Sequence, residues 1–305
     1  MPTIIKTNIA ATVAGLPVLP LTPPPTDIPE LWAGLQFFLD ANWIGAFANV
    51  QSPADDPIVA WQNKWSYRWE DAAARLSWRP GGTGSLYYQR AHRFAASGNG
   101  GWPLMSSDAA RLVNGRKVLT SAIYGQYLHI CGDPTDGSAQ TALLTNDYTW
   151  LIVYKAEAGC TGGLFGQFGL RSNTDAASGG LRFGYESGTN TGKTLFQHRG
   201  GVADTDRLLI ARDTANNLPT FAIISAAANN AGSVRLKNNG SQTDHAFTFT
   251  NPVTNKGGDT ISIGYQDSAG VKRRDITMVA RWSRQLSADD LAYLSAWLET
   301  NYGPF

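Results

Sequence analysis

The residues that could carry acid–base, metal or nucleotide chemistry are few and widely separated. The four histidines, His92, His129, His198 and His245, do not stand at metal-ligand spacing from one another or from another ligand residue. No G-x-S-x-G nucleophile elbow is present. The segment Gly188-Thr-Asn-Thr-Gly-Lys-Thr194 has one residue too few between its glycines for a P-loop, and we interpret it as a hairpin turn. These patterns argue against an enzyme of these classes.

A polar turn could hold a hard cation. Gly132-Asp-Pro-Thr-Asp-Gly137 brings two carboxylates close together, and Ca²⁺ prefers such oxygen ligands. An ordinary Asp/Gly turn accounts for the same residues and is the commoner case. We therefore expect no cofactor, with calcium at this turn left open as the alternative. The two cysteines, Cys131 and Cys160, are far from any metal-binding spacing, and we favour free buried thiols over a single disulfide.

Tryptophans are the best candidates for ligand contact. Six of them fall in one irregular stretch: Trp43, Trp61, Trp65, Trp69, Trp78 and Trp102. Indole rings supply large, rigid surfaces that stack on sugar faces, although core packing explains many of them equally well. Trp69 has charged neighbours and Trp102 lies beside a glycine-rich loop, which favours exposure. The predicted ligand-binding residues are Trp69, Trp102, Trp65 and Trp43.

Composition narrows the classes of partner. The 305 residues carry 25 Lys+Arg against 24 Asp+Glu, a net charge of +1, so nucleic acid and anionic membranes are not expected partners. No apolar stretch reaches the length of a membrane span, and the first residues lack the pattern of a signal peptide. We expect a protein made in a cytoplasm. If it acts outside the cell, it leaves by a route other than general secretion.

Residues 1–30 differ from the rest of the chain. The stretch 16–29 holds six of the 15 prolines, which excludes a helix or a central strand and predicts an extended arm. A loose terminus is one interpretation. The other is an arm that docks onto neighbouring subunits, since a fully solvated tail would not need its apolar residues: Val13, Leu16, Val18, Leu19 and Leu21.

From residue 120 onward, short strand patterns recur about every dozen residues, separated by Gly, Asn, Asp or Pro. Asn238-Asn-Gly240 is a strong hairpin-turn signal, and 150–154 is apolar on both faces, as a buried central strand is. This spacing without helical periods predicts an all-β sandwich or barrel. The predicted strands are 31–39, 127–130, 148–155, 164–170, 181–185, 193–198, 207–211, 220–224, 233–237, 246–249, 260–265 and 276–282.

One helix is expected near the C-terminal end. Ser287-Ala-Asp-Asp290 has the form of a capping box, with a carboxylate three residues after an N-cap hydroxyl. Apolar residues then recur at helical spacing at Leu291, Leu294 and Leu298. The helix should end before Gly303, where the backbone can leave the helical conformation.

The order of several motifs resembles that of concanavalin A-like, laminin-G-like domains of bacterial and phage proteins. The chain carries a glycine-bearing strand at 261–265, a "D-I-x-x-h-x-h-W" strand at 275–282, an "R-x-L-S" link at 284–287, and a helix that ends near Tyr302-Gly303. Upstream matches are Leu31-Trp32, Val59-Ala-Trp61, 111–119 with 125–128, and 144–155. The resemblance implies an antiparallel jelly-roll β-sandwich over residues 31–305, preceded by the arm 1–30.

The glycan-hydrolysing members of this family use clustered carboxylates, roughly E-x-D-x-x-E, on one strand. One carboxylate acts as nucleophile and another as acid, and alternate strand residues place them on one face. This sequence offers only Glu70-Asp71, whose adjacent side chains would point to opposite faces, and the lone Glu186. We therefore expect a chain that is not an enzyme.

Three functional hypotheses follow. We favour a structural protein of a bacteriophage virion, in the tail, the baseplate or a layer that decorates the capsid. It would contact other virion proteins, form a homo-oligomer, with a trimer favoured, and could adhere to a bacterial surface glycan. The alternative is a bacterial carbohydrate-binding module, which would normally need an export signal. A glycan-degrading enzyme is the least favoured.

Overall fold

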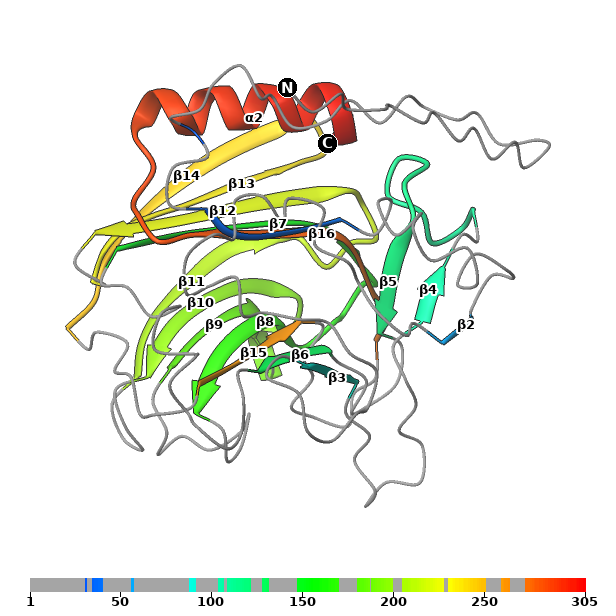
Figure 1. The fold of residues 1–305 in the computed structure, drawn as a ribbon, viewed down its shortest axis with the longest axis horizontal. Helices are drawn as coiled ribbons and strands as arrows, with labels where there is room; N and C mark the ends of the chain where they lie inside the picture. The colour runs from blue at the N-terminus through cyan, green and yellow to red at the C-terminus, as the bar shows by residue number, and fades with distance from the viewer. Residues whose placement is uncertain are drawn as a thin grey trace, which may run out of the picture.

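A computed structural model describes fourteen parts of the chain: residues 31, 35–40, 56–57, 88–91, 104–106, 109–121, 128–131, 147–169, 180–186, 188–199, 205–227, 230–250, 259–263 and 272–305. These residues form two antiparallel β-sheets with one long helix against the outside of the larger sheet (Figure 1). In the described parts, no helix is long and apolar enough to cross a membrane.

The larger sheet has nine strands. β1 (Leu35–Asp40) pairs with one half of β16, beside β5 on the other half. The remaining eight strands follow one another in this order: β14 (Ser241–Thr248), β13 (Ala231–Asn238), β12 (Thr220–Ala227), β7 (Tyr148–Ala156), β16 (Arg274–Trp282), β5 (Val118–Ser121), β4 (Leu104–Ser106) and β2 (Asp56–Pro57).

The smaller sheet has seven strands and faces the larger one (Figure 1). Every strand pair in it is antiparallel. Its order is β11 (Thr205–Asp213), β10 (Lys193–Arg199), β9 (Gly180–Tyr185), β8 (Gly162–Gly169), β15 (Asp259–Ile263), β6 (Leu128–Cys131) and β3 (Tyr88–Ala91).

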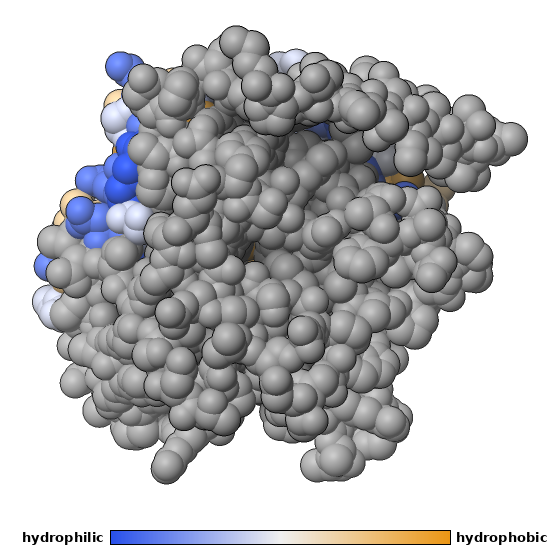
Figure 2. All heavy atoms as spheres, in the orientation of Figure 1, coloured by the Kyte–Doolittle hydropathy of each residue, from blue (hydrophilic) through white to orange (hydrophobic). Residues whose placement is uncertain are grey.

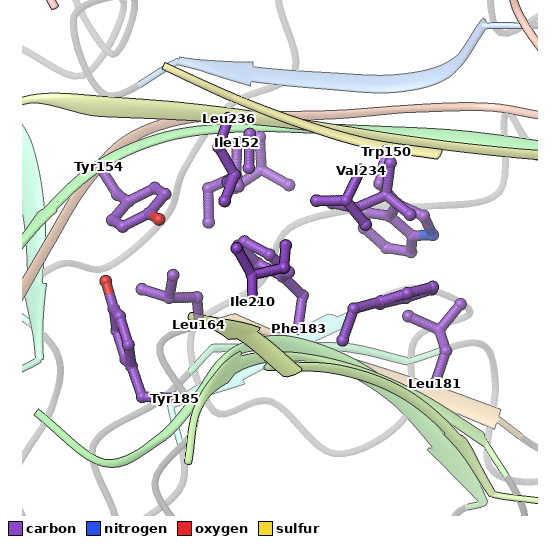
Figure 3. Close-up of a cluster of buried hydrophobic side chains, with 14 of the residues drawn as sticks. Trp150, Ile152, Tyr154, Leu164, Leu181, Phe183, Tyr185, Ile210, Val234 and Leu236 are labelled. Carbon is purple, nitrogen blue, oxygen red and sulfur yellow. The ribbon is translucent and has the colours of Figure 1, made fainter. Parts of the chain in front are cut away.

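The main hydrophobic core lies between the two sheets. Trp150, Ile152 and Tyr154 of β7 point inward, and Phe183 and Tyr185 of β9 meet them from the opposite sheet (Figure 3). Alternate residues of a strand face opposite sides, so each strand contributes every second side chain to this layer. The buried apolar area between the sheets is the principal source of stability of the sandwich.

A second core lies on the outer face of the larger sheet. Leu151 and Val153 of β7 point to this side, and the helix α2 (Ala288–Tyr302) covers them with Leu294, Trp297 and Leu298. All nine residues of β7 are buried. The predicted central strand is thus confirmed, and its apolar character on both faces reflects two separate cores.

The predicted capping box of α2 is present. The Ser287 side chain accepts a hydrogen bond from the Asp290 backbone N–H, and the Asp290 carboxylate accepts one from the Ser287 backbone N–H. Burial raises the pKa of Asp290, but hydrogen bonds from Arg284 and Ser287 outweigh it and leave this pKa below its ordinary value. The helix ends at Tyr302, as expected, and Gly303 donates to the last helical carbonyls.

Turns follow the predicted glycine and asparagine positions. Asn239 and Gly240 join β13 to β14 at φ angles of 48° and 72°. A two-residue hairpin turn of this kind requires positive φ at both central residues, which asparagine and glycine tolerate. The segment 188–194 links the paired strands β9 and β10 through a short 3₁₀ turn, which confirms the hairpin interpretation.

The starts of β1 and β14 differ most from prediction. β1 begins at Leu35, while Leu31 is helical, so the expected strand 31–39 starts later than its apolar pattern suggested. β14 begins at Ser241 rather than Ala246. The sequence did not indicate this start, because the first half of the strand is polar, lies at the edge of the sheet and carries no apolar alternation. Edge strands pack against one neighbour only, so composition marks them weakly.

Candidate functional site

Most residues singled out in the sequence lie outside the described part of the chain. This holds for the predicted ligand-binding tryptophans and arm residues, and for the polar turn: Trp43, Trp65, Trp69, Trp102, Val13, Leu16, Val18, Leu19, Leu21 and 132–137. Those expectations stay predictions. Cys160 is described, and it is a free, fully buried thiol, so it forms no disulfide with Cys131.

The two histidines whose side chains are described, His198 and His245, do not lie together. His198 is buried between the sheets, whereas His245 lies on the edge strand β14 with its Nε2 3.1 Å from the Thr243 hydroxyl. His129 belongs to β6 of the smaller sheet. Among the residues with described positions, no group of three or more His, Cys, Asp or Glu could hold a metal ion.

A buried carboxylate, Asp275, lies on β16 opposite Lys155 of β7 and Thr120 of β5. It accepts a hydrogen bond from the Thr120 hydroxyl at 2.8 Å and pairs with Arg273 at 2.9 Å. Burial raises the pKa of this carboxyl, while Thr120 and the cations around it act in the opposite direction. A carboxylate surrounded by cations and a hydroxyl is arranged as a structural ion pair, not as an acid–base pair.

A polar row crosses the smaller sheet on the face turned away from the core. Arg207, Gln197 and Arg182, on β11, β10 and β9, are successive cross-strand partners. Their chain neighbours Phe196 and Phe183 belong to the core, so these three side chains occupy the opposite face. The backbone register extends the row across the remaining strands through Gly166, Ser262, His129 and Arg90.

Access to this polar row changes along its length. At the β11 edge the Arg207 side chain is 60% exposed, and its guanidinium lies 3.3 Å from the carboxylate of Glu186. An ion pair this exposed contributes about 0–1 kcal/mol to stability, so it holds Arg207 only weakly. Gln197 and Arg182 are only 4% and 8% exposed. The row therefore offers one open end and a shielded centre.

Glycines let the strands beside the row approach closely. Gly184 and Gly163 are cross-strand partners on β9 and β8. A Cβ at Gly184 would stand 2.2 Å from the carbonyl oxygen of Gly162, so no larger residue fits at this position. Both glycines are buried, so they serve the close packing of the two strands and are not part of the open end of the row.

The chemistry of the row suits neutral hydroxylated ligands. Arginine supplies several N–H donors in a plane, and glutamine adds two donors and one acceptor. Neighbouring hydroxyls of a sugar both donate and accept, so they match such groups in pairs. The sequence signal for the row was present, because Arg182, Gln197 and Arg207 interrupt apolar strands at alternate positions. Only the register of the sheet shows that they align.

These features define the chain as an all-β protein: a two-sheet antiparallel sandwich with one C-terminal helix, which confirms the predicted fold class. Comparison with protein-family models and with curated proteins finds no match. Comparison with solved structures finds many.

Domain 4 of AbnA, an extracellular GH43 arabinanase from Geobacillus stearothermophilus solved with arabinotriose, is similar in fold. The TM-score is 0.50 at 15% identity, and the alignment covers 86% of this chain and 98% of that domain. The receptor-binding domain of botulinum neurotoxin C/D mosaic serotype aligns at TM-score 0.48 and 9% identity over 87% of this chain and 51% of its own.

The binding domain of botulinum neurotoxin DC, solved with rat synaptotagmin II, aligns at TM-score 0.44 and 10% identity over 64% of this chain and 45% of its own. This chain therefore spans about half or less of the neurotoxin domains it matches. By their descriptions, the similar structures include receptor-binding domains and one domain with a bound oligosaccharide.

Proposed function

We propose that this chain is a non-enzymatic β-sandwich module that binds glycans through the polar row on the outer face of its smaller sheet. The observation that carries the proposal is the position of Arg207, which is 60% exposed at the β11 end of a polar row that cross-strand register continues through Gln197 and Arg182. The sandwich likeness to an arabinanase domain that holds arabinotriose agrees with this proposal as a fold-level analogy.

Glycan-array screening followed by calorimetric titration of the best ligand tests the site. We expect Arg207→Ala to weaken binding by about tenfold, because Arg207 is the exposed member of the row and a planar donor to a bound hydroxyl is lost. Gln242→Ala is the control, since Gln242 is an exposed strand residue of the other sheet. Equal losses of affinity for Arg207→Ala and Gln242→Ala would contradict binding at the polar row.

The non-enzymatic part of the proposal has its own test. The purified chain is incubated with the polysaccharide that it binds best, and reducing ends are measured over hours. We expect no release above the level of a heat-denatured sample. Steady release of reducing ends would show that the chain is a hydrolase and would contradict the non-enzymatic part of the proposal.

We further propose that the module belongs to the outer layer of a bacteriophage particle, attached through residues 1–30. Support comes from the proline-rich stretch 16–29 before the sandwich and from the low charged fraction of 16%. We expect the full chain to be an oligomer by light scattering and a variant lacking residues 1–30 to be a folded monomer. A monomeric full chain would contradict the attachment role.

A further inference from the structure

Arg281 is a cation buried inside the sandwich. It lies on β16 opposite Trp150 of β7, and its side chain is 1% exposed. Its guanidinium carbon stands 5.5 Å from the centre of the Trp150 ring. Trp150 and Val279 belong to the core between the sheets, and alternation places Arg281 on the same face as Val279.

Tyr148 and His198 are the polar neighbours of Arg281. The Tyr148 hydroxyl lies 2.7 Å from Nε2 of His198, and both residues are almost fully buried. Tyr148 and Trp150 lie on the same face of β7, so Tyr148 is the diagonal neighbour of Arg281 across the strand pair. Burial raises the pKa of Tyr148, and the positive charge of Arg281 acts in the opposite direction. Aromatic rings complete the surroundings, with Phe196 and Phe249 centred 5.3 and 4.7 Å from the His198 ring.

The guanidinium of Arg281 lacks acceptors. Its Nε and Nη1 are buried and have no hydrogen-bond partner among the described atoms. The Trp150 ring contributes a cation–π contact but no hydrogen-bond acceptor to the N–H groups of the guanidinium. By register, Asp206 is the acidic residue opposite His198, and its carboxylate accepts from the Thr250 hydroxyl.

A buried arginine without an anion is an unstable arrangement. Burial lowers the pKa of Arg281 to about 9, which still leaves the guanidinium charged at neutral pH. Buried charges are normally paired, because removing an ion from water costs much more than one cation–aromatic contact returns. The site therefore has a positive charge and unused donors, and it needs a negative charge.

We propose that Arg281 and Tyr148 form an internal site for one small monovalent anion, a halide or a short carboxylate. Arg281 offers Nε–H and Nη1–H. Tyr148 adds its O–H when His198 donates from Nε2 to the phenolic oxygen, because a hydroxyl both accepts and donates. One cation matches one negative charge, and the close packing of a protein interior favours a small ion. This site is separate from the polar row of the proposed glycan-binding function and does not depend on it.

Bromide is the probe, because its anomalous scattering locates it. Crystals of the full chain grown with sodium bromide should show an anomalous peak within hydrogen-bond distance of Arg281 Nε or Nη1. Bromide peaks at surface positions only would overturn the proposal. A parallel crystal grown with sodium formate distinguishes a halide site from one that also takes carboxylates.

Thermal unfolding measures the affinity in solution. At constant ionic strength, balanced with a large sulfonate, the Tm of the wild-type chain should rise with the logarithm of bromide concentration once Kd is exceeded. Arg281→Met should lose about tenfold or more in apparent affinity, and Tyr148→Phe about fivefold. Arg235→Met, at a mostly buried arginine that is already paired with Asp244 and bonded to α2, should keep the full bromide dependence. An unchanged bromide dependence in Arg281→Met would overturn the proposal, whereas glycan binding by this variant should persist in either case.

Discussion

The two ends of β16 carry buried arginines in opposite situations. Arg274 donates from Nη2 to the Thr161 carbonyl at 2.7 Å and from Nε to the Cys160 sulfur at 3.3 Å. Arg281, seven positions later on the same strand, has two guanidinium nitrogens without an acceptor among the described atoms. One strand thus carries an arginine that is hydrogen-bonded within the core at one end of the sandwich, and an arginine that forms the proposed anion site at the other.

The surroundings of the two arginines differ in the same way. Near Arg274, hydroxyl groups satisfy one another: Tyr154 donates to Thr214 at 3.2 Å, and the Thr194 and Thr214 hydroxyls lie 2.7 Å apart. Near Arg281 there are aromatic rings and a single Tyr148–His198 pair. The polar groups at the Arg274 end therefore hold the core together through hydrogen bonds, whereas those at the Arg281 end form the anion site that we propose.

The largest expected effect comes from replacing arginine by methionine at each end of β16, at Arg274 and at Arg281. Arg274→Met should destabilise the fold by about 2–4 kcal/mol, because the Thr161 carbonyl loses its charged donor inside the core. Arg281→Met should be neutral or stabilising by up to about 3 kcal/mol in anion-free buffer, since it removes an uncompensated buried charge. Urea unfolding of both variants measures the difference, and equal losses would break the comparison.

Alkaline pH should reveal the buried tyrosines. Burial raises the pKa of Tyr154 to about 12, while a tyrosine of the unfolded chain ionises near pH 10. Between pH 10 and 12 the unfolded chain therefore binds fewer protons than the folded one. Stability should fall by about 1.4 kcal/mol per pH unit for this residue alone.

Tyr154→Phe should remove that part of the slope, whereas Tyr293→Phe should not, because Tyr293 is 36% exposed. Urea midpoints followed across this pH range provide the measurement. If the slope is the same in wild type and Tyr154→Phe, the Tyr154 phenol ionises in the folded state as it does in water.

The smallest expected effect is that of a substitution in α2, away from both arginines of β16, and it serves as a reference for the variants at the two ends. Ser287→Ala should cost about 1 kcal/mol, since the capping hydrogen bond to the Asp290 N–H is lost. Bromide dependence and alkaline slope should stay as in the wild type. Thermal unfolding checks both, and a changed bromide dependence would mean that the helix layer and the Arg281 site are coupled.

The sequence predicted those elements whose formation depends on residues close together in the chain. The capping box of α2, the Asn239-Gly240 turn and the doubly apolar β7 were all recognisable, because each depends on residues close in sequence. The start of β14 was missed, because an exposed edge strand needs no apolar alternation.

The residues of the candidate sites could be recognised only in the folded structure. Arg182, Gln197 and Arg207 look like unrelated polar residues until cross-strand register aligns them. Arg281 reads as one polar residue in an apolar strand, and its lack of an acceptor depends on every element that surrounds it. The tryptophan prediction lies outside the described residues, so these residues do not test it. The described residues visible at the left of Figure 2 are mostly hydrophilic.

The complete burial of β7 has a consequence for how the molecule comes apart. Its even-numbered residues belong to the inter-sheet core and its odd-numbered residues support the helix layer, so both layers share this one strand. Neither layer can separate from the sandwich without exposing one side of it. Backbone amides of β7 should therefore exchange with solvent only through global opening, and the three layers should melt together in one transition.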